Sequence, residues 1–328
     1  MTRAGIAGWG MAVPSARLTN ADLERMVATS DEWIVSRTGI RERRIAGEGE
    51  TTASLAAEAG AAAIKNAGLT PADIDLLVVA TASPEQPIPH TGAFVGEQLG
   101  LTCGSFDLNA GCVGFVYELV VGAGMLTQGF DNVLLVGAET LSRIVDYDDR
   151  ATCVLFADGA GAIVLQPATG DEGLLSVDLG CDGSAADLLM VPAGGSRLPT
   201  SEATVAAGGH YLKMNGSEVF KRAVRATIDS AQSALDRAGL TAGDVDWFIP
   251  HQANLRIISA AIQRLGIAED RTVVNLDRYG NTSAASIPIA MVEAVDDGRI
   301  RDGDVVLLAG FGAGMTWASA ALRWGRPA

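Results

Sequence analysis

Positive charge, histidine and paired cysteines are all scarce in this chain. Its 24 Lys and Arg residues face 39 Asp and Glu residues, a formal net charge of −15. That balance excludes nucleic-acid binding by a whole-molecule basic field, although a local basic patch stays possible. The four cysteines form no C-x-x-C pair, so neither a zinc ribbon nor a dithiol redox motif is supported. No run of about 18 apolar residues occurs, so we expect no membrane-spanning helix.

The N-terminus makes a poor secretory signal. Only Arg3 is basic there, and the apolar stretch is broken by Gly5, Gly8, Gly10 and Pro14. Free thiols in a reducing compartment are the simplest setting, so we expect a cytoplasmic protein. Hydrophobic residues make up 48% of the 328 residues, which excludes a disordered chain and suits a large core. At about 150 residues per domain, this length predicts roughly two domains.

Apolar runs alternate with helical patterns along the whole chain. The predicted strands are 74–80, 132–138, 153–157, 162–166, 247–250, 305–310 and 318–324. The predicted helices are 51–68, 112–129, 217–239, 254–266 and 283–298. Continuous apolar strands between helices indicate sheets that are covered on both faces. The fold class is therefore α/β.

The chain also contains an internal repeat. Segment 66–80, NAGLTPADIDLLVVA, shares six of fifteen residues with segment 237–251, RAGLTAGDVDWFIPH, at an offset of 171. The helical patterns 112–129 and 281–298 each end in Gly before a strand, at an offset of 169. Two βαβ domains can look alike for generic reasons, but the shared GLT-x-x-D-x-D pattern exceeds apolar alternation. The repeat predicts two halves built on one plan.

The repeat places three polar residues at comparable positions. Cys112 and Asn281 start equivalent helices, and His251 ends a strand. Ligands of α/β proteins gather at the carboxyl ends of strands. If the halves face each other about a pseudo-twofold axis, the three residues converge. We expect an N-terminal half, residues 1–168, carrying Cys112 and a C-terminal half, residues 169–328, carrying His251 and Asn281.

Cys112 has the local setting of a nucleophile. In FDLNAGCVGFVYELV a strand ends near Leu108, a small-residue turn follows, and a helix begins at the cysteine. A helix N-terminus favours the thiolate, which attacks acyl carbon, and offers a backbone N–H to an oxyanion. The alternative is a buried structural cysteine, the commonest fate of a free thiol. Cys103, Cys153 and Cys181 lack this setting, and we expect them to be structural.

The other candidates are weak when taken alone. His251 follows an apolar strand and Pro250, where a satisfied core histidine is the commoner outcome. Asn281 alone would be an ordinary N-cap. The glycine clusters 158–162, DGAGA, and 310–314, GFGAG, precede strand-like segments and not helices. That context argues against dinucleotide loops, and close backbone approach to a substrate explains GFGAG better.

Six motifs together resemble a known family. They are SDEWIVSRTGIRERR (30–44), FDLNAGC (106–112), DGAGA (158–162), PHQANLRI (250–257), GNTSAAS (280–286) and GFGAG (310–314). In order and spacing they are similar to β-ketoacyl-[acyl-carrier-protein] synthase III, the initiating condensing enzyme of type II fatty-acid synthesis. The resemblance covers essentially the whole chain. It implies a thiolase-like fold, two βαβαβαβ halves in a five-layered αβαβα arrangement, usually as a homodimer.

The resemblance implies roles for the three candidates. Cys112 would be the nucleophile, and His251 and Asn281 would complete the triad; related elongating synthases have His at the third position. Cys112 would take an acyl group from acyl-CoA. Malonyl-acyl carrier protein would then lose CO2, with His251 and Asn281 donating hydrogen bonds to its thioester oxygen, and the enolate would attack the acyl-cysteine. The oxyanion donors would be the N–H groups of Cys112 and Ala313. No cofactor and no metal are expected.

The resemblance also implies contacts for both substrates. Residues matching CoA contacts are Thr29, Trp33, Arg37, Arg150, Gly216 and Asn254, with Trp33 and Arg150 flanking the adenine. Carrier protein is acidic, so docking needs local positive charge. Residues matching docking positions are Lys221, Gln252 and Arg256. Arg41, Arg43 and Arg44 are expected to form a solvated charged face.

Ile88 aligns with a family position, often Phe, that closes the acyl pocket of the partner subunit. The shorter Ile88 predicts a deeper pocket that admits primers beyond acetyl. The alternative is that other wall residues fill the space and acetyl-CoA stays preferred.

Two other functions remain open. One is a superfamily acyltransferase or condensing enzyme of secondary metabolism with the same triad. A carboxylate base near the cysteine would favour head-to-head condensation, but Glu118 lies inside the helix and is not obviously placed for that. The other is a non-catalytic ketosynthase-like partner subunit. Retention of Cys112, His251 and Asn281 argues against it.

Overall fold

The chain folds around two mixed sheets. The computed structural model describes residues 3–327. The first sheet has the order β1 (Arg3–Ala12), β7 (Asp158–Ala168), β6 (Val133–Thr140), β4 (Leu76–Ala80) and β5 (Gly104–Leu108). The second has the order β11 (Trp247–Pro250), β12 (Val305–Gly312), β13 (Thr316–Arg323) and β8 (Gly173–Cys181). In both sheets a parallel pair, β4 with β6 or β11 with β12, is followed by two antiparallel neighbours.

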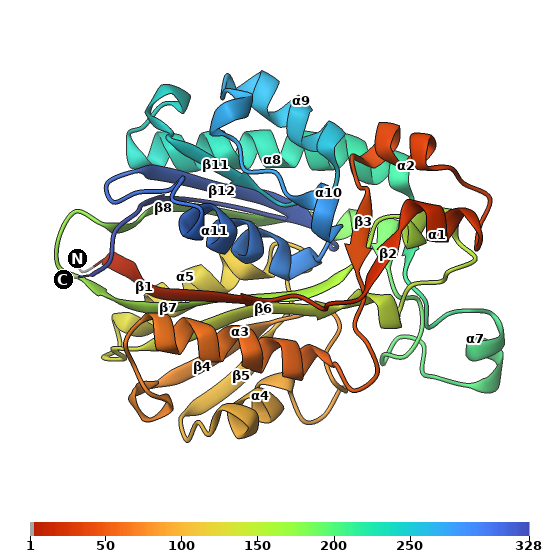
Figure 1. Ribbon diagram of the computed structural model, residues 1–328, viewed down its shortest axis with the longest axis horizontal. Helices are drawn as coiled ribbons and strands as arrows, with labels where there is room; N and C mark the ends of the chain where they lie inside the picture. The colour runs from red at the N-terminus through yellow and green to blue at the C-terminus, as the bar shows by residue number, and fades with distance from the viewer. Residues whose placement is uncertain (1–2, 328) are drawn as a thin grey trace.

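Helices cover both outer faces and fill the space between the sheets (Figure 1). The outer helices are α3 (Thr52–Asn66) and α4 (Thr91–Leu99) on the first sheet, and α8 (Gly216–Ala238) and α9 (Leu255–Leu265) on the second. Between the sheets lie α5 (Gly114–Leu126) and α11 (Ser286–Asp296), which contact β6 and β7 on one side and β13 and β11 on the other. This is the five-layered αβαβα arrangement, and it confirms the predicted fold class. No helix within residues 3–327 is long and apolar enough to cross a bilayer.

The remaining elements are short. They are β2 (Arg17–Thr19), α1 (Asn20–Glu24), α2 (Asp31–Thr38), β3 (Glu42–Arg44), η1 (Pro71–Asp73), η2 (Leu141–Arg143), α6 (Arg150–Cys153), η3 (Gly183–Leu188), β9 (Leu189–Met190), α7 (Glu202–Ala206), β10 (Lys213–Met214), η4 (Ala242–Asp244), η5 (Glu269–Arg271), α10 (Leu276–Tyr279) and η6 (Ser283–Ala285). The segment carrying α7 projects from the body of the molecule (Figure 1).

The sequence repeat forms the same local structure twice. The hydroxyl and N–H of Thr70 both donate to Asp73, at 2.6 and 2.8 Å, and those of Thr241 donate to Asp244 at the same distances. The second aspartate of each motif accepts from the backbone N–H at the start of the neighbouring strand. Asp75 does so from Asn132 at 2.8 Å, and Asp246 from Val305 at 2.9 Å. The repeated polar residues therefore fix where the β4 and β11 strands begin and hold each of them against its neighbouring strand.

Glycines allow the middle helix layer to approach the first sheet. A Cβ at Gly161 in β7 would lie 2.7 Å from Cβ of Pro288, and one at Gly137 in β6 would lie 2.5 Å from the carbonyl oxygen of Ala284. The DGAGA cluster lies inside β7, so it is a contact surface for α11 and not a loop.

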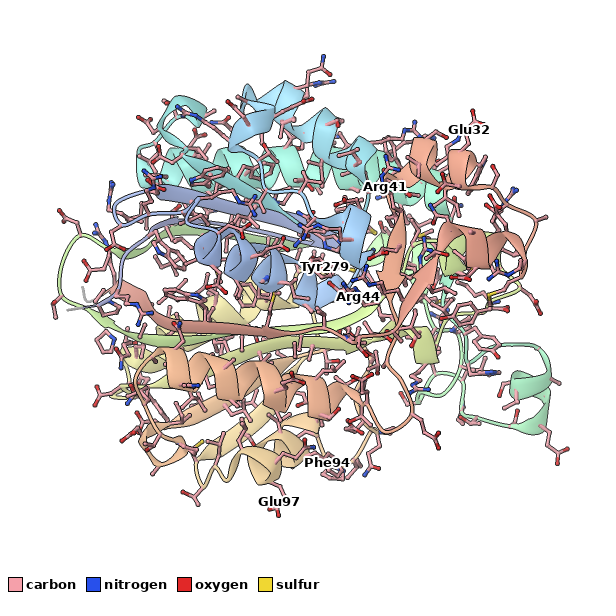
Figure 2. All side chains as sticks on the ribbon, in the orientation of Figure 1. Glu32, Arg41, Arg44, Phe94, Glu97 and Tyr279 are labelled. Atoms are coloured by element: carbon pink, nitrogen blue, oxygen red, sulfur yellow. The ribbon has the colours of Figure 1, made fainter. Side chains whose placement is uncertain are left out.

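Two expectations about local structure were wrong. Residues 153–157 form no strand; α6 ends at Cys153, and the turn after it pairs with the backbone of Asn281. Arg43 is not solvated but 0% exposed. Its guanidinium donates to the carbonyl oxygens of Leu18 and Val154, and these acceptors offset its desolvation. Arg41 is exposed and Arg44 is half-buried. The Arg44 guanidinium lies 5.5 Å from the ring centre of Tyr279, and both residues are labelled in Figure 2.

Candidate active site

Cys112 lies in a turn between β5 and α5. The helix begins at Gly114, two residues later than the sequence pattern predicted. Gly111 adopts a φ of 56°, and a Cβ there would lie 2.7 Å from the backbone nitrogen of Ala313. A Cβ at Gly312 would lie 2.5 Å from the nitrogen of Cys112. Only glycine permits this approach, which brings the end of β12 against the cysteine turn.

His251 follows β11 and is held by the neighbouring strand. Its backbone N–H donates to the carbonyl oxygen of Ala309 at 2.9 Å. A Cβ at Gly310 would lie 2.7 Å from Cβ of His251, so glycine again makes room for the ring. The imidazole meets the edge of Phe311, with 5.7 Å between ring centres.

Asn281 is positioned by hydrogen bonds on three sides. Its backbone N–H donates to Leu155 and its carbonyl oxygen accepts from Ala157, both at 2.9 Å. Its side-chain Oδ1 accepts from the N–H of Ser283 at 2.9 Å. That bond fixes the orientation of the amide and leaves its NH2 group as the donor for a ligand.

The three candidates lie together in one cavity of about 690 Å³. Its lining includes Cys112, His251 and Asn281 at the base, with Trp33, Arg37, Gly216, Lys221, Asn254 and Arg256 among the other wall residues. Elements from both predicted halves contribute to it. The cavity therefore combines a thiol, an imidazole and an amide with a cationic mouth.

Cys112 also lines a second cavity, of about 440 Å³. Cys112 and Ala313 line it together with apolar side chains from several distant segments, which are Leu141, Ile144, Phe156, Leu189 and Leu212. Sequence reasoning missed these five wall residues, because an apolar side chain in a strand or turn carries no signal that separates a pocket wall from the core. Cys112 thus lines two cavities, one shared with His251 and Asn281 and one that these five apolar side chains border.

The remaining predicted contact residues are Arg150, Thr29 and Ile88. The Arg150 guanidinium stacks on Trp33 at 4.6 Å from the ring centre and donates to the carbonyl oxygen of Ala28 at 2.9 Å. The hydroxyl of Thr29, beside Ala28 in the chain, is buried and makes no hydrogen bond within the described residues. Ile88 is 85% exposed and lines neither cavity of its own chain.

Gln252 is a correction to the predicted docking surface. It is only 1% exposed. Its Nε2 donates to the carbonyl oxygens of Pro250 and Val273 at 2.7 and 3.1 Å, and its Oε1 accepts from the N–H of Asn275 at 3.0 Å. A side chain with all these bonds satisfied internally is unavailable to a protein partner. It braces the turn that carries His251.

Burial controls the protonation of the Cys112 thiol and the His251 imidazole. Burial, with a smaller contribution from the nearby Glu139 carboxylate, raises the pKa of Cys112 to about 12. The Ser283 hydroxyl and the backbone N–H of Ala313 lower the thiol pKa, but less than burial raises it. Burial also lowers the pKa of His251 to about 3. The free protein at neutral pH therefore holds a protonated thiol and a neutral imidazole, contrary to the thiolate expected from the helix start.

Glu139 and Glu118 are the buried acids of this region. Glu139 accepts from the Ser83 hydroxyl at 2.5 Å and from the N–H of Ala82 at 3.1 Å, so donors surround its carboxylate below the cysteine turn. Burial raises the pKa of Glu118 well above its usual value, and Glu118 lines neither cavity. Glu118 is thus not positioned to act as the base of a head-to-head condensation.

Comparison with known proteins gives consistent matches over the chain. The family described as 3-oxoacyl-[acyl-carrier-protein (ACP)] synthase III matches residues 106–183, and the C-terminal part of that family matches residues 235–324. The β-ketoacyl-[acyl-carrier-protein] synthase III of Symbiobacterium thermophilum is 53% identical over 98% of each chain.

Solved structures show the same similarity. The 3-oxoacyl-[acyl-carrier-protein] synthase III of Aquifex aeolicus aligns with a TM-score of 0.90 at 41% identity, covering 98% of this chain and 100% of that one. The priming β-ketosynthase of the R1128 polyketide pathway aligns with a TM-score of 0.91 at 36% identity, covering 100% and 98%.

Proposed function

Since the chain belongs to the β-ketoacyl-[acyl-carrier-protein] synthase III family, and so is the acyltransferase that initiates fatty-acid synthesis, we propose that its Cys112 carries the acyl group from acyl-CoA to malonyl-acyl carrier protein. The observation that carries the proposal is that Cys112 lines two cavities, one shared with His251 and Asn281 and one bordered by the five apolar side chains named above. The first suits thioester chemistry and the second suits an acyl chain.

The first half-reaction is acyl transfer to the thiol. The sulfur of Cys112 bonds to the acyl carbon of acyl-CoA, the carbon–sulfur bond to CoA breaks, and the thiol proton leaves with CoA. The backbone N–H groups of Cys112 and Ala313 donate to the oxygen of the tetrahedral intermediate. Because the thiol proton ends on CoA, this step needs no net proton uptake.

The second half-reaction is decarboxylative condensation. Malonyl-acyl carrier protein loses CO2, and His251 and Asn281 donate hydrogen bonds to its thioester oxygen as the enolate charge develops there. The enolate carbon attacks the acyl carbon on Cys112 and the bond from that carbon to the sulfur breaks, which gives 3-oxoacyl-acyl carrier protein and a Cys112 thiolate. One proton taken from solvent restores the thiol. With that proton, atoms and charge balance without a metal or a redox cofactor, so none is proposed.

The CoA portion of the substrate fits the mouth of the larger cavity. Trp33, Arg37, Gly216 and Asn254 line it, and a guanidinium pairs well with phosphate. A ring between Trp33 and Arg150 would require a separation of about 7 Å, more than the observed 4.6 Å. We propose that Arg150 moves away from Trp33 when the adenine binds.

Mass spectrometry tests the proposed function directly. Incubation with acetyl-CoA should add one acetyl group that is retained through denaturation, and malonyl-acyl carrier protein should then discharge it with release of CO2. An acetyl adduct that malonyl-acyl carrier protein leaves in place would contradict the condensing role. Failure to form any adduct with a range of acyl-CoA primers would contradict the whole proposal.

We propose a homodimer formed at the β5 edge of the first sheet. β5 pairs only with β4 among the described strands, so its other edge is open. Phe106 and Leu108 on it are only partly buried, and α4, with Phe94 and Glu97 labelled in Figure 2, lies beside it. An open edge with apolar side chains favours pairing with a second copy. The exposed Ile88, in the loop before α4, would then reach the acyl cavity of the partner.

Ile88→Phe should restrict the accepted primers to shorter acyl chains. The larger ring would fill the end of the partner's acyl cavity, where one methylene is worth about 1–3 kcal/mol. We expect the kcat/KM ratio of hexanoyl-CoA to acetyl-CoA to fall at least about tenfold. Leu179→Phe, at an exposed apolar position on β8, serves as the matched control. If the unmodified protein already rejects every primer longer than propionyl-CoA, the deeper pocket is wrong.

Arg256→Glu should weaken use of the acidic carrier protein. Arg256 is exposed at the first turn of α9, with its guanidinium 5.1 Å from the Phe220 ring centre. We expect the KM for malonyl-acyl carrier protein to rise roughly threefold to tenfold at low salt, and the difference to shrink at about 0.5 M salt. Arg264→Glu, in the last turn of the same helix, is the control. An equal effect of both variants would argue against a local docking site.

A further inference from the structure

The His251 imidazole has one bonded and one unbonded nitrogen. Its Nδ1 lies 2.6 Å from Oγ of Ser286, the first residue of α11. Its Nε2 is buried and has no hydrogen-bond partner among the described residues, while the ring lines the larger cavity. The nitrogen without a partner is therefore the one available to substrate.

The hydrogen bonds around Ser286 decide which nitrogen carries the proton. The backbone N–H of Gln252 also points to the Ser286 Oγ, at 3.4 Å, and occupies one of its lone pairs. Within residues 3–327, Nδ1 of His251 is the only acceptor within reach of the Ser286 hydroxyl proton. If Nδ1 carried a proton instead, the Ser286 hydroxyl, which lines neither cavity, would be a buried donor with no acceptor among the described residues, and that is costly. A proton on Nε2 costs less, because the ring lines the larger cavity, where substrate can accept it. The hydroxyl therefore donates to Nδ1, and Nε2 carries the ring proton.

The surrounding structure holds both groups in place. The Gln252 side chain is anchored to Pro250, Val273 and Asn275, which fixes the direction of the Gln252 N–H. The position of α11 is fixed by its contact with Gly161, where Pro288 would meet any added Cβ at 2.7 Å. Ser286 and His251 thus come from two elements that cannot shift independently of the core.

We propose that Ser286 is a positioning residue that holds the neutral His251 imidazole in its Nε2–H tautomer, as a permanent hydrogen-bond donor to the substrate. This rests on the proposed function and goes beyond it, because it names the residue that fixes which His251 nitrogen donates during decarboxylation. In the other tautomer Nε2 would present a lone pair to the developing enolate oxygen and repel it. His251 is then not the acceptor of the Cys112 proton.

Nitrogen NMR of ring-15N-labelled histidine tests the tautomer. The chain has only three histidines, so His90→Gln and His210→Gln assign the His251 signals. In the unmodified protein we expect a protonated Nε2 and an unprotonated Nδ1. Ser286→Ala should give mixed or reversed protonation, and Ser286→Thr, which keeps the hydroxyl, should restore the original pattern. A protonated Nδ1 in the unmodified protein, or an unchanged pattern in Ser286→Ala, would overturn the proposal.

The kinetic consequence separates the two half-reactions. Ser286→Ala should slow release of CO2 from malonyl-acyl carrier protein by about tenfold to a hundredfold and change acyl transfer from acetyl-CoA by less than about threefold. Ser319→Ala, which removes a buried hydroxyl that has no hydrogen-bond partner among the described residues, is the control and should change neither. Equal slowing of both half-reactions would contradict the positioning role. If no acyl-enzyme forms in any variant, the proposed function fails, whereas the NMR result still decides the tautomer.

Discussion

Cys112→Ala should form no acyl-enzyme and should lose at least about 10⁴-fold in overall turnover. Among residues 3–327, Cys112 is the only cysteine that lines either cavity, and without its thiol the acyl group has no covalent carrier. Intact-mass measurement after incubation with acetyl-CoA checks the first half-reaction. Release of CO2 from malonyl-acyl carrier protein checks the second, which can continue slowly without the acyl group.

The other cysteines provide controls for that experiment. Cys181 is exposed and Cys153 is buried, and neither lines a cavity with His251 or Asn281. Cys181→Ala and Cys153→Ala should keep the acetyl adduct. Stable acetylation of Cys112→Ala at another residue would disprove the assignment of the nucleophile. Alkylation of Cys112 itself, followed at its own peptide, should also rise about tenfold per pH unit, because burial raises the pKa of Cys112 to about 12 and the thiolate is the reactive form.

Asn281→Ala should slow decarboxylation by about 10²–10³-fold and leave acyl transfer within a few-fold of normal. Charge develops on the malonyl thioester oxygen only in the second half-reaction, and the free NH2 group of Asn281 is placed to donate to it. His251→Ala should show the same division. Acyl transfer is followed by the mass of the adduct, and decarboxylation by release of CO2.

The alanine variant of Asn281 also removes a structural bond, because its Oδ1 accepts from the N–H of Ser283. Asn281→Asp keeps that acceptor and lacks the donor, so it isolates the catalytic hydrogen bond. A matched thermal unfolding temperature for the two variants would show that the turn is intact. If both variants slowed acyl transfer and decarboxylation equally, Asn281 would not act in the second half-reaction alone, and the prediction would be refuted.

Residue types and their spacing in the sequence were sufficient to predict the duplicated fold of this protein and its family. The two GLT-x-x-D-x-D copies predicted a duplicated fold, and in the structure Thr70 with Asp73 and Thr241 with Asp244 form identical turns. These bonds join residues three positions apart, so they follow from the sequence alone. The motifs around Cys112, His251 and Asn281 also predicted the family and the residues to examine, because residue type and spacing are properties of the chain itself.

Desolvation and the contacts of distant segments could not be predicted in this way. Whether Arg43 or Gln252 meets water or carbonyl groups depends on strands and turns far away in the chain. The pKa of Cys112 was misjudged for the same reason: a helix start favours the thiolate locally, but packing against the end of β12 removes the thiol from water. The second cavity at Cys112 exists only where segments of both halves meet, and the Ser286–His251 bond joins two segments of the C-terminal half. No sequence pattern places either set of groups together.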